Sequence, residues 1–524
     1  VPNSVTLLSV TPDPTLAEAP PETRSTAGMT TKVVIGSLWT LAGQVAPLAV
    51  SLVTTPFTIR MLGAEGYGVF ILISLIPTYL GFADFGMGMA STKFGSEAYA
   101  EGDEEKEGRV VRTAAVISLC TSVPIAALLM IFAGYIISLF NVPAEFTSQA
   151  TLALRLASIT FVINFLCGIF NTPQLARLRM DLNTLVVSGF RVVGIIGTPV
   201  AIYFGFGILG AVLVLMAASI FMLTCHIYAS SRLLRQLIGF NLDVEAVNRL
   251  LQFGGAFALS TVAALLLGGS EKFILAHATT VKELAYYSVS FTIATMLTVF
   301  SGSMTQSLVP AFSQLQGDSQ LDRLSDLYRR CIRLTAIAFF PTVVFVAIIG
   351  RFFLTFWAGE EFGQRSSSLL YILLAGVLLN AVAFFPVAVI MASGRTQTLA
   401  VLYWVELAVY IPIAFVMVMT FGAVGAATAW SIRVVLDAIF LFLLARKACR
   451  VSFGRPPAMA VLAAATLAIP TALVFYVGSI TVILLALSVI GFAIYAVIVW
   501  HYLLTVDEIN WIRSRKYGHF VFRY

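Results

Sequence analysis

The chain has 524 residues, of which 59% are hydrophobic and 11% are charged, and its mean hydropathy is +0.93. Soluble domains contain roughly 45–50% apolar and 25% charged residues, so this composition excludes a soluble globular protein and indicates a chain that buries most of its surface in lipid. The formal net charge of +6 is then no sign of nucleic-acid binding, because in a membrane protein the placement of the basic residues carries the information.

Residues 1–30 are rich in Pro, Thr, Ser and Glu and contain no apolar run of helical length. They lack the basic start and apolar stretch of a signal peptide, so we predict a disordered cytoplasmic tail. Position 1 is Val and Met29 stands directly before the first apolar run, which makes Met29 a candidate start of the chain.

Fourteen apolar runs of about 20 residues follow, and each is long enough to cross roughly 30 Å of hydrocarbon. The sequence therefore predicts an all-α polytopic membrane protein with about fourteen transmembrane helices. Closely spaced neighbours must form tight helical hairpins. The predicted spans are 33–59, 67–92, 110–140, 150–172, 185–204, 207–229, 251–277, 284–309, 332–356, 367–391, 398–420, 423–445, 457–477 and 480–503.

The distribution of Lys and Arg predicts the orientation of these spans. With the N-terminus inside, the cytoplasmic segments hold 24 of the 32 basic residues, and three more lie within spans. This asymmetry places both termini in the cytoplasm. The external segments hold only five basic residues, which are Arg60, Arg155, Lys282, Arg351 and Arg365.

The chain also repeats itself. Residues 134–146 (GYIISLFNVPAEF) match 350–362 (GRFFLTFWAGEEF), a shift of 216, and 205–214 match 420–429, a shift of 215. Each unit contains six spans, an even number, so both copies have the same orientation and are predicted to be related by a pseudo-two-fold axis along the membrane normal, with a polar site between them.

The repeat defines the predicted domains. An N-lobe spans residues 31–230, a cytoplasmic linker 231–250 and a C-lobe 251–447, followed by two further spans in 448–505 and a cytoplasmic interfacial tail at 506–524. The segment 317–333 places Leu324, Leu327 and Cys331 on one helical face, so we predict a helix lying in the membrane interface.

The second span contains unusual chemistry for a membrane helix. Pro77, Gly81, Gly86 and Gly88 predict a bend, and Pro341 and Pro386 predict bends in the second half. Asp84 lies inside the same span, in FADFGMG. An acid at this depth is either a cavity group that binds a cation or cycles a proton, or a side chain that satisfies the backbone at a helix break.

Several motifs carry a resemblance to a known family: GSLWTLAGQ at 36–44, RMLGAEGYGVF at 60–70, FADFGMGMASTKF at 82–94 and LFNVPAEF at 139–146. With the layout of six, six and two spans, they make the chain resemble the polysaccharide (O-antigen-type) flippase branch of the multidrug/oligosaccharidyl-lipid/polysaccharide (MOP) exporter superfamily, over about residues 30–505. The resemblance implies movement of polyprenyl-diphosphate-linked glycans from the cytoplasmic to the external leaflet.

Such a substrate needs cations for its diphosphate, because charges cross hydrocarbon only along a polar path. The candidate substrate-binding residues are Arg60, Arg191, Lys272 and Arg433. Adjacent side chains point about 100° apart on a helix, so Glu271 and Lys272 cannot both face one narrow cavity. We predict that Lys272 is the one that faces it. Arg191 has the alternative of extending to the cytoplasmic interface.

The candidate ion-coupling residues are Asp84, Glu271, Glu406 and Asp437. Arg433 and Asp437 stand four residues apart and share a helical face, so an alternative is a mutually neutralised pair that packs two helices. The five cysteines (Cys120, Cys167, Cys225, Cys331 and Cys449) have no metal-ligand spacing, and neither a metal, a disulfide frame nor a cofactor is expected.

Three functions are compared. The first is a lipid-linked oligosaccharide flippase of a bacterial-type cytoplasmic membrane that works by alternating access, whose partners are the lipid-linked oligosaccharide, membrane lipids and other polysaccharide-assembly proteins. The second is an ion-coupled multidrug exporter on the same fold. The third, a membrane glycan polymerase or ligase, is disfavoured because no external loop exceeds about a dozen residues. We predict a transporter, not an enzyme, with no nucleic-acid partner.

Overall fold

The described part of the chain contains helices and no strands in the computed structural model, which describes residues 21–237, 239, 242–316, 320–451, 459, 462–468, 482–506 and 508–510. The first half contains α1 (Pro21–Tyr79), α2 (Met87–Glu101), α3 (Glu104–Ile131), α4 (Ala133–Ser138), α5 (Ala144–Phe170), α6 (Thr172–Ala176), α7 (Met180–Ala201) and α8 (Gly207–Leu233). The second half contains α9 (Val244–Leu267), α10 (Ser270–Ala278), α11 (Val281–Met296), α12 (Val299–Gln314), α13 (Leu321–Ala358), α14 (Glu360–Ala392), α15 (Thr396–Cys449) and α17 (Val482–Ile498).

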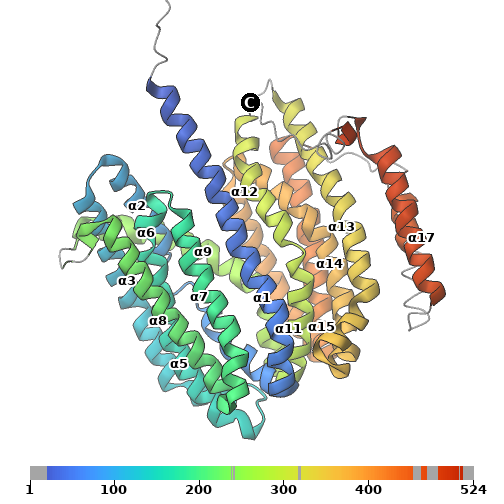
Figure 1. Ribbon diagram of the computed structural model, residues 1–524, viewed down its shortest axis with the longest axis horizontal. Coiled ribbons are helices and arrows are strands. Elements are labelled where there is room, and N and C mark those ends of the chain that lie inside the picture. The colour runs from blue at the N-terminus through green and yellow to red at the C-terminus, as the bar shows by residue number, and fades with distance from the viewer. Residues whose placement is uncertain are drawn as a thin grey trace, which may run out of the picture.

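These helices form two bundles side by side. Figure 1 shows α2–α8 on one side and α10–α15 on the other, with α1 running between them and α17 at the far edge. We call α1–α8 the N-terminal bundle and α10–α15 the C-terminal bundle. The predicted all-α polytopic fold is confirmed, whereas the pseudo-two-fold relation between the bundles stays a prediction.

The longest helix of the C-terminal bundle, α15, is a hairpin of two spans. Its Arg433 and Glu406 are 27 residues apart, which is about 40 Å along a straight helix, yet an Arg433 nitrogen lies 2.9 Å from a Glu406 oxygen. The chain reverses at Gly422, whose φ of 57° and ψ of −133° are not helical. Glycine allows this turn because it has no Cβ to clash at positive φ.

Two more reversals occur in the N-terminal bundle. Gly205 and Gly207 have φ of 86° and 55° between α7 and α8, and Gly197 of α7 packs against the side chain of Val214 of α8. This is the hairpin that the sequence predicts for spans 185–204 and 207–229. Within α1, Gly63 has φ of 71° and ψ of 174°, so α1 also consists of two helices.

Nine helices in the described part of the chain are long and apolar enough to cross a membrane, or ten if α11 and α12 count as one bent span. Three of these nine contain the breaks described above. Two of them cover two predicted spans each, and the one at 39–79 covers the first predicted span and the first half of the second. Most of predicted span 457–477 lies outside the described residues. The protein is therefore a multi-pass membrane protein, and the total of fourteen spans stays a prediction.

Four predicted spans are broken, one of them, 110–140, only at Phe132 between α3 and α4. The span 67–92 is interrupted between α1 and α2, where Phe85 and Gly86 have φ of 50° and 69°. The span 251–277 is divided between α9 and α10, and the span 284–309 between α11 and α12, which meet at 45°. The predicted bend in the second span is present, whereas α13 and α14 continue through Pro341 and Pro386.

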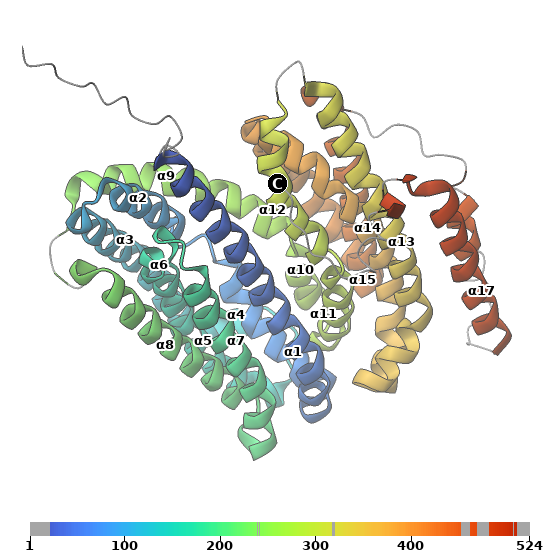
Figure 2. The ribbon, with the colours of Figure 1, turned by 45° about the horizontal axis from the view of Figure 1, so that its top comes forward.

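Helix α9 connects the two bundles. Figure 2 shows α9 crossing the upper end of the molecule from one bundle toward the other. At its start, Ala246 and Leu250 are buried against Met87 of α2 and neighbouring residues of α3, and at its end Leu267 is buried against Leu407 of α15. One helix is thus packed into both bundles, so a movement between them must involve α9.

The two bundles meet at the end that carries Gly63, Gly207 and Gly422. We call this the outer end, since the sequence predicts that it faces outward, and the opposite end the inner end. The Asn141 amide donates to the carbonyl of His277 at 2.9 Å, and the indole of Trp357 donates to the carbonyl of Leu52 at 2.7 Å. The outer end is therefore closed by hydrogen bonds between the bundles.

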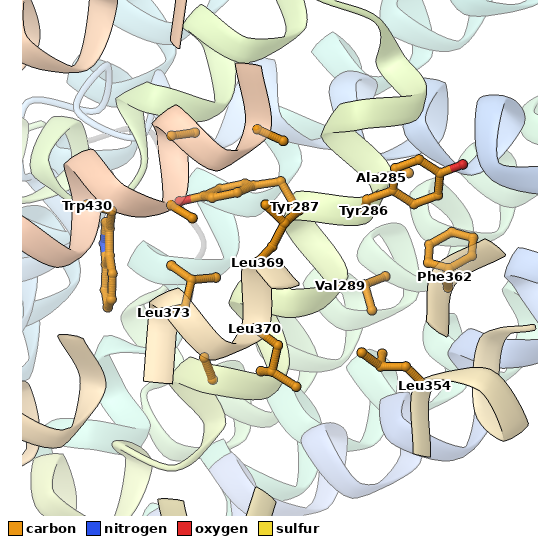
Figure 3. Close-up of a cluster of buried hydrophobic side chains, with 14 of the residues drawn as sticks. Ala285, Tyr286, Tyr287, Val289, Leu354, Phe362, Leu369, Leu370, Leu373 and Trp430 are labelled. Atoms are coloured by element: carbon orange, nitrogen blue, oxygen red, sulfur yellow. The ribbon is translucent and has the colours of Figure 1, made fainter. Parts of the chain in front are cut away.

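The core of the C-terminal bundle is formed by α11, α13, α14 and α15 (Figure 3). Tyr286 and Phe362 meet edge to face with ring centroids 5.0 Å apart, and Leu370 and Leu373 are fully buried between the helices. Edge-to-face aromatic pairs add to the stabilisation that comes from area burial alone. This packing fixes α11, which carries Tyr287 toward the polar groups described below.

The predicted interfacial helix at 317–333 is wrong. Residues from Leu321 onward are the first turns of α13, which continues to Ala358, and residues 317–319 lie outside the described part. The apolar face that was assigned to lipid is instead buried within the protein, where Leu324 and Tyr328 pack on α12, α14 and α15. An amphipathic pattern is the same whether a membrane surface or another helix covers it.

The predicted tails lie mostly outside the described residues. Helix α1 begins at Pro21, and a proline is well suited to the first turn of a helix. The disordered tail at 1–30 stays a prediction. At the other end, Glu508 forms ion pairs with Arg330 and Arg333 of α13. Burial alone would raise the pKa of Glu508, but the Thr505 N–H and these two arginines outweigh it and lower the pKa.

Candidate functional site

A cavity of about 590 Å³ lies within the N-terminal bundle, between the second part of α1 and helices α5, α7 and α8. Most of its lining is apolar, as in many ligand sites, and polar side chains project from each of the four elements. The polar lining residues are Ser74, Thr78, Thr160, Asn164, Asn171, Arg191, Ser219 and His226.

Among the described residues that line this cavity, Arg191 is the only charged one. It projects from α7, about 16 Å along the helix from Met180 at the inner end, by the usual rise of an α-helix. No described residue forms an ion pair or hydrogen bond with its guanidinium. A cation at this depth is tolerated where it faces a wet cavity, and there it remains free to bind an anion.

Asp84 lines a second cavity of about 300 Å³, between the α1–α2 break, the inner end of α5 and α9. Its carboxylate accepts hydrogen bonds from the backbone N–H groups of Gly86 at 2.8 Å and Gly88 at 3.3 Å. Asp84 therefore satisfies the backbone at a helix break and lines a cavity at the same time. The two cavities share Gly81, Gly168 and Asn171, so they adjoin.

Glu271 is fully buried at the start of α10. Its two carboxylate oxygens accept hydrogen bonds from the hydroxyls of Tyr287 at 2.8 Å and Tyr410 at 2.7 Å. The adjacent Lys272 points elsewhere, with its Nζ 3.9 Å from the centre of the Phe291 ring. The two charges thus face different neighbours, as the helical angle between adjacent residues requires.

Arg433 forms its ion pair with Glu406 across the α15 hairpin, with a nitrogen–oxygen distance of 2.9 Å and both side chains nearly buried. The alternative in which Arg433 pairs with Asp437 is wrong for the described residues, since one Asp437 oxygen is buried without any hydrogen-bond partner. Arg433 also lies 5.4 Å from the Tyr410 ring, so this pair is joined to the group around Glu271.

Arg60 lies at the outer end, where it donates to the carbonyl of Phe356 at 2.6 Å. The structure therefore separates the eight candidates into three places. Arg191 and Asp84 line adjoining cavities of the N-terminal bundle, and Arg60 joins the bundles at the outer end. The remaining five gather in one polar cluster between α10 and α15: Glu271, Lys272, Glu406, Arg433 and Asp437.

Comparison with known proteins assigns this arrangement to a family. Residues 59–367 match the family of polysaccharide biosynthesis proteins, and this match covers more than half of the chain. The chain belongs to this family. A Shigella flexneri protein provisionally named an O-antigen transporter is 25% identical over 425 residues, which are 80% of this chain and 99% of that protein. The uncharacterised membrane protein EpsK of Bacillus subtilis (strain 168) is 20% identical over 352 residues, 66% of this chain and 68% of that protein.

Solved structures share the fold of this polysaccharide biosynthesis protein. The lipid II flippase MurJ in an inward-closed conformation aligns with a TM-score of 0.67 at 13% identity, over 90% of this chain and all of that chain. An inward-facing MATE family transporter of the MOP superfamily aligns with a TM-score of 0.61 at 18% identity, over 78% of this chain and 98% of that one. The predicted polysaccharide family is confirmed, and the fold that these two solved structures share agrees with the predicted superfamily. The prediction of a transporter rather than an enzyme agrees with the names of these relatives.

One polar contact and one cavity residue of this family member were not found from the sequence. Glu107 of α3 is fully buried and holds Arg177, which follows α6, through two hydrogen bonds of 2.7 and 3.1 Å. His226 of α8, which the sequence analysis does not single out, is buried and lines the main cavity. Glu107 stands among several surface acids in the sequence, so nothing in its local pattern marks it as buried.

Proposed function

We propose that this protein moves a polyprenyl-diphosphate-linked oligosaccharide from the cytoplasmic to the external leaflet by alternating access. The observation that supports this most directly is the unpaired Arg191 at membrane depth, in a cavity to which all four surrounding helices contribute polar side chains. Charged and hydroxylated head groups cannot cross hydrocarbon without such a path, because each unpaired charge costs several kcal/mol or more. The lipid tail stays in the bilayer while the head group passes through the protein.

The charge of the main cavity favours an anionic substrate over a cationic drug. Its lining contains an arginine and no carboxylate among the described residues. A pocket for cationic drugs needs the opposite charge, and Asp84 in the adjoining cavity is the residue that favours this second candidate, an ion-coupled multidrug exporter. Because Asp84 also holds two backbone N–H groups, its carboxylate is already partly engaged.

The remaining candidates belong to the proposed transport cycle. Lys272 carries a charge without an ion pair among the described residues, and Arg433 is paired, so in the proposal Lys272 meets the diphosphate when the bundles rearrange. In the proposal, Arg60 controls the exit of the substrate at the outer end, where its hydrogen bond to Phe356 joins the bundles. Asp84, Glu271, Glu406 and Asp437 are the proposed sites for a coupling ion or proton, since membrane-buried acids often serve proton relays.

The proposal also covers the domain limits, the orientation in the membrane and the partners of the protein. The N-lobe (31–230), linker (231–250), C-lobe (251–447), last two spans (448–505) and tail (506–524) follow the predicted domain limits, with both termini in the cytoplasm of a bacterial-type cell. Membrane lipids and other membrane proteins of polysaccharide assembly are the proposed partners, besides the lipid-linked oligosaccharide itself.

Reconstituted vesicles test the proposed activity. Purified protein is inserted into vesicles with a labelled polyprenyl-diphosphate oligosaccharide, and the label that appears in the opposite leaflet is measured. We expect Arg191→Ala and Lys272→Ala to abolish translocation. Arg329→Ala, which removes an exposed pair with Asp326, is the matched control and should translocate normally. Unchanged translocation in both the Arg191 and the Lys272 variants would rule out their role, and efflux of a cationic dye without lipid movement would favour the exporter.

A further inference from the structure

His226 is a buried side chain whose hydrogen bonding is incomplete. It belongs to α8, borders the main cavity of the N-terminal bundle and has no exposed surface. Its Nδ1 lies 3.2 Å from the side-chain nitrogen of Gln174, whereas its Nε2 has no partner among the described residues. Buried polar groups are almost always hydrogen-bonded, so the free Nε2 needs an explanation.

The neighbours of His226 determine which ring nitrogen carries the proton. The Ser230 hydroxyl donates to the carbonyl of Phe170 at 2.7 Å, so its oxygen is left to accept from the Gln174 amide at 3.1 Å. The Gln174 nitrogen therefore acts as a donor to Ser230 and to His226 Nδ1, because an amide nitrogen has two hydrogens and accepts none. His226 is then neutral, with its hydrogen on Nε2, and this N–H is the unsatisfied donor.

An unsatisfied acceptor lines the same cavity. The side-chain oxygen of Asn171 is buried without a partner, while its nitrogen donates to Asn183 at 3.2 Å. Asn171 and Gln174 are linked by a backbone hydrogen bond of 3.0 Å in the turn that starts α6, so the acceptor lies close to the residue that holds His226. A donor and an acceptor that line the same cavity match a hydroxyl group, which accepts and donates, better than a phosphate, which only accepts.

We propose that His226 and Asn171 form a subsite for a sugar hydroxyl, separate from the diphosphate that Arg191 attracts. This inference rests on the proposed function, because it assigns the glycan part of the same substrate. The Nε2–H of His226 donates to the hydroxyl oxygen, and the hydroxyl hydrogen is donated to the Asn171 oxygen. The neutral imidazole adds no charge, so the subsite recognises the sugar and not the phosphate.

The short helix α6 holds this subsite in place. Gln174 is fully buried in α6, and Arg177, just after α6, is held by Glu107 of α3 and lies over the Tyr99 ring. Glu107 and Arg177 do not line the cavity and act as positioning residues through Gln174. Their burial explains why a five-residue helix can fix a side chain in the cavity.

Two conservative variants test the proposal. His226→Asn places an acceptor near the former Nδ1, so it keeps the contact with Gln174 but removes the donor at the Nε2 position. His226→Gln places its amide nitrogen near the former Nε2 and keeps that donor. The probes are undecaprenyl diphosphate and undecaprenyl diphosphate carrying one N-acetylglucosamine, and the dissociation constants are measured by thermophoresis of the full chain in detergent.

We expect the wild type and His226→Gln to bind the sugar-bearing lipid more tightly than the sugar-free lipid. His226→Asn should lose about three- to tenfold of that advantage while its affinity for the sugar-free lipid stays unchanged, as expected for one hydrogen bond. Arg191→Gln should weaken the binding of both lipids alike. A wild type that binds both lipids equally, or a His226→Asn variant that keeps the full advantage, would overturn the subsite. A wild type that binds neither lipid would overturn the proposed function, and the subsite with it.

Discussion

Charged side chains at membrane depth divide into paired and unpaired groups. Arg433 is neutralised by Glu406, and Glu271 is held by two tyrosine hydroxyls, so these groups are compensated inside the C-terminal bundle. Arg191 has no such partner and faces a cavity. Since an uncompensated charge in the membrane persists only where water or a ligand reaches it, this contrast separates groups that hold the bundle together from groups that meet the substrate.

The Arg433–Glu406 pair gives a prediction at this scale. Arg433→Met leaves the carboxylate of Glu406 buried without its cation, and removing one partner of a buried pair costs about 3–5 kcal/mol. We expect a clear fall in the melting temperature in detergent, as measured by tryptophan fluorescence. The double variant Glu406→Leu/Arg433→Met should recover most of the loss, because no unpaired charge remains in the pair.

Arg329→Met is the control for that experiment, since its pair with Asp326 is exposed and surface pairs contribute little. A double variant as unstable as the sum of the single variants would show that the two side chains act independently and would contradict the pairing.

Sequence reasoning recognises candidate site residues better than their partners. Ionisable residues inside apolar runs are conspicuous, which is why Arg191, Glu271 and Arg433 could be named. Their partners could not, because pairing is decided by which helices lie side by side: Glu107 and Arg177 are 70 residues apart in sequence. His226 was missed for a different reason, since an uncharged ring near a span end has no distinctive pattern.

At the scale of elements, glycines determine where spans reverse and how closely they approach. A Cβ at Gly425 would lie 1.9 Å from the carbonyl oxygen of Met417, in the other arm of the α15 hairpin. Backbone cannot move aside as a side chain can, so the two arms approach this closely only with glycine at this position. Small residues allow the same close approach between membrane helices in general.

Gly425→Ala should therefore destabilise the hairpin. We expect this to be measured as a lower melting temperature and as weaker expression of folded protein. Gly189→Ala in α7 is the matched control, because no atom lies within 4 Å of the added methyl group. An alanine in a helix interior is favoured over glycine by about 1 kcal/mol, so Gly189→Ala should leave stability unchanged or raise it. Equal melting temperatures for the two variants would contradict the close contact at Gly425.

The elements that the sequence predicts well are those that depend on local pattern. Apolar runs located the spans, and prolines and glycines located the break in span 67–92. The break between α9 and α10 at Gly268–Gly269 was not predicted, because a pair of glycines is common in membrane helices and breaks them only when tertiary contacts favour it. Here a Cβ at Gly269 would meet the Tyr79 hydroxyl of the other bundle.

At the scale of the whole molecule, the structure is closed at the outer end and crossed by α9 at the inner end. Buried residues of α10 and α11, such as Ala276 and Leu284, belong to the apolar cluster of the N-terminal bundle, beside Ile137 and Leu154. The two bundles therefore share one core at the outer end. Alternating access requires this shared core to separate, which exposes residues that are now fully buried.

Cysteine labelling from outside tests this separation. Ala276→Cys, in a background whose five native cysteines are replaced by alanine, should react slowly with a membrane-impermeant maleimide, because Ala276 has no exposed surface. Adding Asn141→Ala and Trp357→Phe removes the hydrogen bonds to His277 and Leu52. Each lost bond weakens the closed state by about 1 kcal/mol, so the loss of both should accelerate labelling about thirtyfold.

A cysteine at Glu145, exposed at the outer end of α5, serves as the control and should react rapidly in both backgrounds. If the rate at position 276 stayed the same after both hydrogen bonds were removed, the outer contacts would not control access. The shared core alone would then hold the bundles together, because its apolar contacts are unaffected by either substitution. Opening would in that case have to begin elsewhere, and α9, the helix that packs into both bundles, is where the structure allows it.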